Sequence, residues 1–129
     1  MDATANAGVI DALYQAYVTG DLAAFDAYTE DSVWHELGLN ERTGVYKGMQ
    51  AIIEHGMQLA ALTDGTTATQ VIEILPGEDH VAVLERATAK RKGRTLDMVC
   101  CSVYRLNEAK IAELNVLPFD AAAWDEFWS

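Results

Sequence analysis

The stretch Ala-Tyr-Val-Thr-Gly-Asp-Leu-Ala-Ala-Phe, at residues 16–25, contains the end of one predicted helix and the start of another. Apolar residues recur at helical spacing from Val9 to Tyr17, and Gly20 stands where a left-handed C-terminal cap is expected. Asp21 is suited to be the N-cap of a second helix, because its carboxylate can accept a hydrogen bond from a free backbone N–H group. The stretch therefore predicts two consecutive helices before the first strand.

The rest of the chain contains one more helical pattern and several strand-like runs. A strand starts at about residue 32, and Gly48 precedes a helix whose apolar face runs from Met49 to Ala60. Four further strand-like runs follow, at residues 67–75, 81–91, 94–106 and 111–117. Three helices in the N-terminal half followed by consecutive hairpins predict a single α+β domain over residues 1–129, with the helices on one face of an antiparallel sheet.

Charge and cysteine content argue against several classes of partner. The chain has 129 residues, with 9 lysines and arginines against 20 aspartates and glutamates, and a formal net charge of −11. Such a charge repels phosphate backbones and anionic lipids, so we expect neither nucleic acid nor membrane as a partner. Cys100 and Cys101 are adjacent, which suits neither a disulfide framework nor a metal site. The N-terminus does not resemble a signal peptide, so we expect a cytoplasmic protein without metal or cofactor.

Several short motifs together resemble a known superfamily. Besides residues 16–25, these are Asp-Ser-Val-Trp-His (31–35), Gly-Val-Tyr-Lys-Gly (44–48), Lys-Ile-Ala-Glu-Leu (110–114) and Asp-Glu-Phe-Trp (125–128). In this order they resemble the nuclear transport factor 2-like superfamily, and in particular its branch of SnoaL-like polyketide cyclases and ketosteroid isomerases. The resemblance implies a cystatin-like cone, in which a curved sheet wraps around the helices and encloses an apolar pocket. It also implies a homodimer.

The ketosteroid isomerases carry a catalytic set that this chain matches only in part. By the resemblance, Glu36 falls where they have an Asp general base, and Tyr28 falls on one tyrosine of their hydrogen-bonded network. Leu13 replaces the oxyanion-hole tyrosine, Ser102 replaces the second donor, and Gly56 replaces a further network tyrosine. An enolate needs preorganised donors to stabilise its charge, so steroid isomerisation is not expected.

Two other branches of the superfamily also match incompletely. Limonene-epoxide-hydrolase-like members carry Glu-Arg-x-Asp on a central strand and an Asp on the last strand. Here Arg86 matches, but Thr88 replaces the first Asp and the last strand offers only Asn115. The His and Asp of the polyketide cyclases fall near Ser102 and Leu117, and both are replaced. The resemblance therefore implies the fold more firmly than any one reaction.

Strand alternation indicates how the first strand presents its titratable residues. Neighbouring side chains point to opposite faces, so Trp34 and Glu36 should share one face and His35 the other. We expect Glu36 to face the interior as a proton-transfer base and His35 to face outward. If the register is shifted by one residue, His35 becomes the base. The competing interpretation pairs Glu36 with Arg42 or Lys47 near the rim.

The other predicted contacts with a ligand line the cone. They are Tyr17, Tyr28, Trp34, Gly56, Arg86, Met98, Ser102, Tyr104 and Asn115. Arg86 could hold a carbonyl or carboxylate, or it could pair with a neighbour across the sheet.

Two functions remain open. In one, the protein is an enzyme that uses acid–base catalysis to isomerise, cyclise, dehydrate or hydrate an apolar small molecule. In the other, it binds an apolar metabolite without catalysis. Val99, Cys101 and Val103 alternate onto the face opposite the pocket and favour a homodimer. The aromatic residues of 124–128 should cover either the pocket mouth or the partner subunit.

Overall fold

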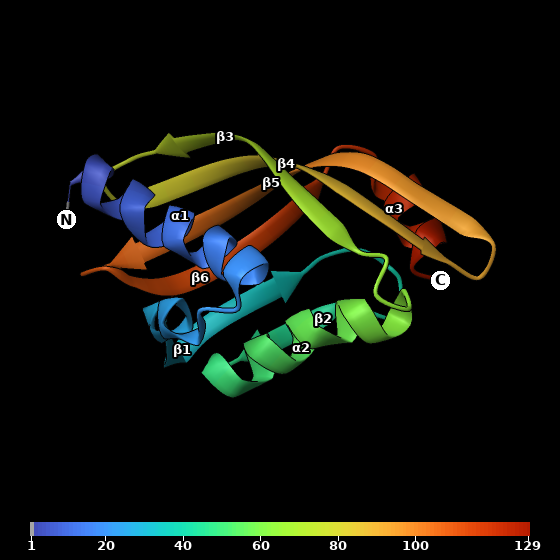
Figure 1. Cartoon of the computed structure of the whole chain (residues 1–129), viewed down its shortest axis with the longest axis horizontal. Coiled ribbons are helices and arrows are strands. Elements are labelled where there is room, and N and C mark those ends of the chain that lie inside the picture. Colours follow the sequence, from blue (N-terminus) through green and yellow to red (C-terminus); the bar gives the residue numbers. More distant parts are fainter. Residues whose placement is uncertain (1) are drawn as a thin grey trace.

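The structure is a computed structural model, and it describes residues 2–129. Figure 1 shows helices packed against one curved sheet. In chain order the elements are α1 (Ala3–Thr19), the 3₁₀-helix η1 (Leu22–Ala27), β1 (Tyr28–Glu36), β2 (Gly44–Lys47), α2 (Met49–Leu62), β3 (Ala68–Pro76), β4 (His80–Arg91), β5 (Arg94–Asn107), β6 (Lys110–Pro118) and α3 (Ala121–Phe127). The predicted α+β class is confirmed. Among residues 2–129, none of the helices is long and apolar enough to cross a membrane.

The caps at the junction of α1 and η1 form where the sequence predicts them. Gly20 adopts a left-handed conformation with φ of 75°, and its N–H donates to the carbonyl of Ala16 at 2.8 Å. The Asp21 side chain accepts from the N–H of Ala23 at 3.1 Å and so starts η1. The second helix is a six-residue 3₁₀-helix, because the chain is already extended at Tyr28, where it pairs with Ile111 of β6.

The six strands form one sheet in the order β2-β1-β6-β5-β4-β3. All neighbours are antiparallel except β1 and β6, which run parallel. The expectation of a wholly antiparallel sheet is therefore wrong for this one pair. Hairpin turns fix the directions of β3 to β6, but β1 reaches β6 only through a long excursion of the chain, whose direction no turn residue specifies.

The helices bury one face of this sheet. In Figure 1, α1 crosses β3 and β4, α2 lies along β1 and β2, and α3 covers the far end of the β4–β5 hairpin. One core cluster lies under α1 and includes Ile10, Leu13 and Tyr104, whereas a second lies under α3 and includes Trp124. Val116 of β6 packs against both clusters, so the interior is continuous from α1 to α3.

Candidate active site

Glu36, the last residue of β1, lies inside the protein and is only 3% exposed. Its Oε1 atom is 3.3 Å from Nε2 of His55 and 3.4 Å from Nε of Arg42, and the Arg42 residue is fully buried. Trp34 shares the inner face, as alternation requires. Glu36 is thus paired with Arg42, as the competing interpretation held, but the pair is buried and does not lie at the rim.

His55 of α2 belongs to this cluster, although it is not among the predicted site residues. It is 3% exposed, its ring stacks on Tyr46 with centroids 3.6 Å apart, and burial lowers its pKa because a buried imidazolium is poorly solvated. Its Nε2 atom also lies 3.1 Å from Nη2 of Arg42. Arginine only donates, so this nitrogen either accepts from Arg42 or donates to Glu36. The spacing of His55 with Ile52, three residues earlier on the buried face of α2, could have indicated this position.

His35 faces outward and does not join the interior cluster. Its Nε2 atom is 3.2 Å from Oε2 of Glu113, and both side chains are about one-third exposed. The alternative in which His35 replaces Glu36 as an interior base is therefore wrong. His35 instead pairs with Glu113 of β6 on the outer face of the sheet.

A second buried carboxyl, Glu85 of β4, has a different kind of partner. Glu85 is 7% exposed, and the hydroxyl of Ser102 on β5 donates to its Oε1 atom. Burial raises the pKa of Glu85, while hydrogen bonds from Ser102 and Tyr14 partly oppose that rise. Within residues 2–129, no lysine, arginine or histidine forms an ion pair with Glu85. This carboxyl is stabilised by hydroxyl groups alone.

Two tyrosines extend the hydroxyl network around Glu85. The Tyr104 hydroxyl donates to the Tyr14 hydroxyl at 2.8 Å, and the two rings meet edge to face with centroids 6.2 Å apart. Burial, followed by the nearby negative charge of Glu85, raises the pKa of Tyr14 above its ordinary value. Both effects keep the hydroxyl protonated, so Tyr14 is available as a donor beside the carboxyl.

The strand register connects the two carboxyls. Val116 of β6 is paired with Glu36 on one side and with Ser102 on the other, and Ser102 contacts Glu85. Burial, followed by the charges of Glu85 and then Glu36, raises the pKa of Cys100 to about 12. Cys100 shares the buried face of β5 with Ser102, so Glu85 and Glu36 both face the interior that this strand covers.

Several predicted contact residues lie on this inner face. Trp34, Ser102 and Tyr104 are buried there, and Met98 is partly exposed. Gly56 of α2 has no atom within 4 Å of the position that a Cβ would take, so no neighbouring side chain fills that position.

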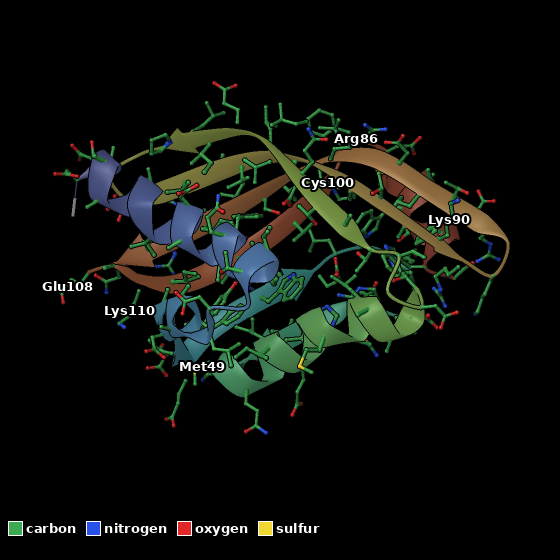
Figure 2. All side chains as sticks on the ribbon, in the orientation of Figure 1. Met49, Arg86, Lys90, Cys100, Glu108 and Lys110 are labelled. Atoms are coloured by element: carbon green, nitrogen blue, oxygen red, sulfur yellow. The ribbon has the colours of Figure 1, made fainter. Side chains whose placement is uncertain are left out.

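Four predicted contacts lie elsewhere. Arg86 points away from the helices (Figure 2) and pairs with Asp97, and both side chains are about half exposed. Asn115 lies in a depression on the outer face, beside Val103 and Glu113. Tyr28 is buried, but it pairs with Ile111 whereas Glu36 pairs with Val116, five residues further along β6, so the two residues are roughly 17 Å apart. Tyr17 is 61% exposed at the end of α1.

The alternation of side chains along a strand explains why Arg86 and Asn115 do not face the interior as predicted. On β4 the buried residues Val81, Val83 and Ala89 lie on the same face of the strand as Glu85. The neighbouring residue, Arg86, therefore points to the outer face. On β6, Leu114 and Val116 face inward and place Asn115 outside in the same way.

Two hollows on the surface of residues 2–129 can be compared with the predicted pocket. One, of about 270 Å³, lies between the start of β3 and the β4–β5 hairpin, and its lining includes Thr66, Thr88 and Leu96. The other, of about 120 Å³, is the depression on the outer face beside Asn115. Neither includes Glu36 or Glu85 in its lining. The enclosed apolar pocket around these carboxyls stays a prediction.

Known proteins share this fold and part of this sequence. The family model of the SnoaL-like domain matches residues 10–114. The structure of Bal32a, from a soil-derived mobile gene cassette, is similar with a TM-score of 0.92 and 30% identity, covering 100% of both chains. An uncharacterised protein of Mycobacterium tuberculosis is 26% identical over 118 residues, which is 90% of each chain. A putative SnoaL-like polyketide cyclase from Jannaschia has a TM-score of 0.77 and 13% identity, covering 98% of this chain and 94% of its own.

Proposed function

We propose that this chain, which belongs to the SnoaL-like domain family, is a small enzyme that moves a proton within an apolar substrate. The reaction would be an isomerisation, cyclisation, dehydration or hydration in the interior between α1, α2 and the sheet. The observation that supports this proposal most strongly is Glu85, a buried carboxyl with a raised pKa and only hydroxyl partners. A carboxyl in such a place can exchange a proton more readily near neutral pH, because its two protonation states are closer in free energy.

Glu85 is better suited to proton transfer than Glu36. The Arg42 guanidinium forms a buried ion pair with Glu36, with Nε 3.4 Å from Oε1, so Glu36 already has a structural partner. Glu36 therefore balances the buried charge of Arg42, and Glu85 is the general acid–base group. This assignment replaces the role that the resemblance to the isomerases implies for Glu36.

The hydroxyls beside Glu85 would contribute the donors that such a reaction needs. When the substrate gives up a proton, negative charge develops on one of its oxygens, and a fixed donor lowers the energy of that state. Tyr14, held by Tyr104, is a protonated donor beside the carboxyl. The neighbouring inner-face residues Met98, Cys100 and Val116 are apolar and suit an apolar substrate.

The proposal can be tested by deuterium exchange. Wild-type protein and the variants Glu85→Gln and Glu36→Gln would be incubated in heavy water with β-tetralone, a cyclic ketone with an acidic C–H group next to its carbonyl. Incorporation of deuterium is followed by proton NMR. We expect the wild type and Glu36→Gln to catalyse exchange and Glu85→Gln to lose it by a factor of about 10² to 10⁴.

The opposite pattern, with exchange lost only in Glu36→Gln, would return the base role to Glu36. Exchange that is equal in wild type and both variants would contradict acid–base catalysis by either carboxyl. The conservative change to glutamine keeps the shape of each side chain and its ability to form hydrogen bonds.

We also propose that the protein is a homodimer through the outer face of the sheet. Val99, Cys101 and Val103 of β5 lie on that face and are only partly buried, and Leu117 is 40% exposed. A second copy would remove this apolar surface from water. Sedimentation at micromolar concentration should show a dimer that Val103→Lys dissociates, and a monomeric wild type would contradict the proposal.

A further inference from the structure

β3 has a free edge. It is the last strand of the sheet, and β4 is the strand that pairs with it. Within residues 2–129, no backbone–backbone hydrogen bond outside the β3–β4 ladder involves residues 68–76. In Figure 1 the second half of β3, which ends in the arrowhead, forms the upper margin of the molecule. The N–H and C=O groups on this side of β3 are therefore available to a further strand.

The side chains of β3 do little to protect this edge. Every residue of the strand except Ile74 is exposed, and Glu73 is its single charged residue. A bulge between Val71 and Glu73 leaves Ile72 without a partner on β4, and Ile72 is 54% exposed. Edge strands are usually protected by short length, by lysines or by several charges. A nine-residue strand with exposed apolar side chains is instead suited to pairing with another strand.

The opposite edge of the sheet is different. β2 has only four residues, Gly44–Lys47, and it ends in a lysine. A contact between β3 of one copy and β2 of the next would be head-to-tail, would pair few residues and would continue into a filament. A contact between β3 and β3 of a second copy pairs two long strands around a two-fold axis and closes after two copies. Length and symmetry therefore favour β3 as its own partner.

The faces of β3 are compatible with such a pair. Val71 and Ile74 pair with residues of β4 that face the interior, whereas Gln70 and Leu75 pair with residues that face outward. An antiparallel register that sets Val71 opposite Ile74 of the second copy also sets Gln70 opposite Leu75 of that copy. Each side chain then meets one on the same face, and the inner pair joins two β-branched residues, which is a favourable cross-strand combination.

Charges at the two ends of β3 are complementary in the same arrangement. Lys90 lies beside the start of β3, because its N–H donates to the hydroxyl of Thr66 at 2.8 Å. Glu78 and Asp79 directly follow the end of β3 and are exposed. Figure 2 shows Lys90 at one end of the molecule and the acidic residue Glu108 at the other. Antiparallel pairing would bring the acidic turn of each copy toward the basic hairpin of the other, which favours this orientation.

We propose that the free edge of β3 is the docking site for β3 of a second copy of this chain, in an antiparallel pair that extends the sheet. The proposal goes beyond the proposed function and does not depend on it, since neither Glu85 nor the outer face forms the contact. A strand edge covers less surface than a sheet face, so this contact is weaker than the outer-face dimer. At high concentration the two contacts together would produce a tetramer.

The variant Val103→Lys isolates the edge contact, because it removes the outer-face dimer. Sedimentation of this variant should show monomers at micromolar concentration and dimers at hundreds of micromolar. Adding Ile72→Asp should weaken the association about tenfold, because the charge enters the contact twice and lies near Glu73 of the other copy. Val18→Asp on α1 is the matched control, since Val18 is 83% exposed and lies outside the edge.

Hydrogen exchange of the backbone amides locates the contact. In Val103→Lys, the amides of β3 that point away from β4 should exchange about fivefold more slowly at the high concentration than at micromolar concentration. The amides of β2 should exchange at the same rate at both concentrations.

Exchanging the charges tests the orientation of the two strands. In the Val103→Lys protein, Lys90→Glu and Glu78→Lys should each weaken the association about threefold to tenfold, because each places like charges near one another. The two changes together should restore it, since opposite charges then face each other again. Restoration would not occur if the strands paired in parallel.

Four results would overturn the inference. A Val103→Lys protein that stays monomeric at hundreds of micromolar, with rapid exchange in β3, would show that only water meets this edge. Equal weakening by Ile72→Asp and Val18→Asp would show that net charge controls the association. Assemblies that grow beyond two copies in the Val103→Lys protein would indicate pairing of β3 with β2. Failure of the double charge exchange to restore the association would contradict the antiparallel arrangement.

Discussion

Glu36 and Glu85 are the same residue type, both face the interior of the cone, and both are less than a tenth exposed. They differ in what surrounds them. Glu36 lies against the guanidinium of Arg42, whereas Glu85 meets the hydroxyls of Ser102 and Tyr14. A cation stabilises the charged carboxylate, but hydroxyls only partly replace the water that burial removes. Burial alone therefore does not identify the acid–base group. The group that contacts each carboxyl, a cation or a hydroxyl, decides which of the two is suited to proton transfer.

The largest effect should follow from breaking the ion pair of Glu36. Arg42→Met keeps a long side chain but leaves the buried carboxylate without its cation, which should lower the free energy of unfolding by about 3–5 kcal/mol. Urea denaturation measures the change. Arg86→Met is the matched control, because Arg86 pairs with Asp97 at the exposed surface and should contribute no more than about 1 kcal/mol. Equal losses of unfolding free energy in the two variants would show that the buried ion pair stabilises the protein no more than the exposed one.

The next effect concerns the pH dependence that Glu85 confers. Because its pKa in the folded protein is raised, the stability that Glu85 contributes is complete below its unfolded pKa. That contribution is then lost as the pH rises through the folded pKa. Glu85→Gln cannot ionise, so the variant should gain stability relative to the wild type as the pH increases from about 4 to about 8. Denaturation curves across this range should therefore diverge, and parallel curves would contradict a raised pKa.

A smaller effect is expected where α3 holds the loop that carries Arg42. One carboxylate oxygen of Asp125 accepts from the N–H of Leu39 at 2.9 Å and from the side-chain amide of Asn40 at 2.7 Å. Asp125→Ala should lower the free energy of unfolding by about 1–2 kcal/mol, because two hydrogen bonds to a charged acceptor are lost near the surface. Thermal unfolding measures the loss, with Glu126→Ala on the same helix as the control. If both variants have the same melting temperature, the loop does not depend on α3.

The smallest effect should come from the outward-facing neighbour of Glu36. His35 pairs with Glu113 where both side chains are about one-third exposed, so His35→Ala should change stability by less than about 1 kcal/mol. The same variant should leave deuterium exchange intact. A loss of exchange in His35→Ala with the fold retained would restore a catalytic role to this residue.

Local sequence signals predicted most of the fold. Gly20 and Asp21 mark the junction of the first two helices because caps depend on residues that are adjacent in sequence. The parallel pairing of β1 with β6 was not predicted, because it joins segments about 80 residues apart without a hairpin turn. The fold class thus follows from local chemistry, but one strand direction does not.

The site was harder to predict for a related reason. The alternation of side chains along β1 predicted that Glu36 faces the interior, because Trp34 lies two residues earlier on the same face. The ion pair with Arg42 and the contact with His55 arise only when a loop and α2 fold against β1, and a single sequence does not show such contacts. Glu85 was within reach of prediction, because the alternating apolar residues of β4 place it on the inner face.

The titration of Glu85 in the folded protein tests its role as the acid–base group most directly. Carbon NMR of the side-chain carboxyl groups, with Glu85→Gln used to assign the signal, gives the midpoint for this residue. We expect a midpoint above the ordinary value of 4.5, because burial without a cation disfavours the charged form. A midpoint at or below 4.5 would contradict the assignment of Glu85 as the acid–base group.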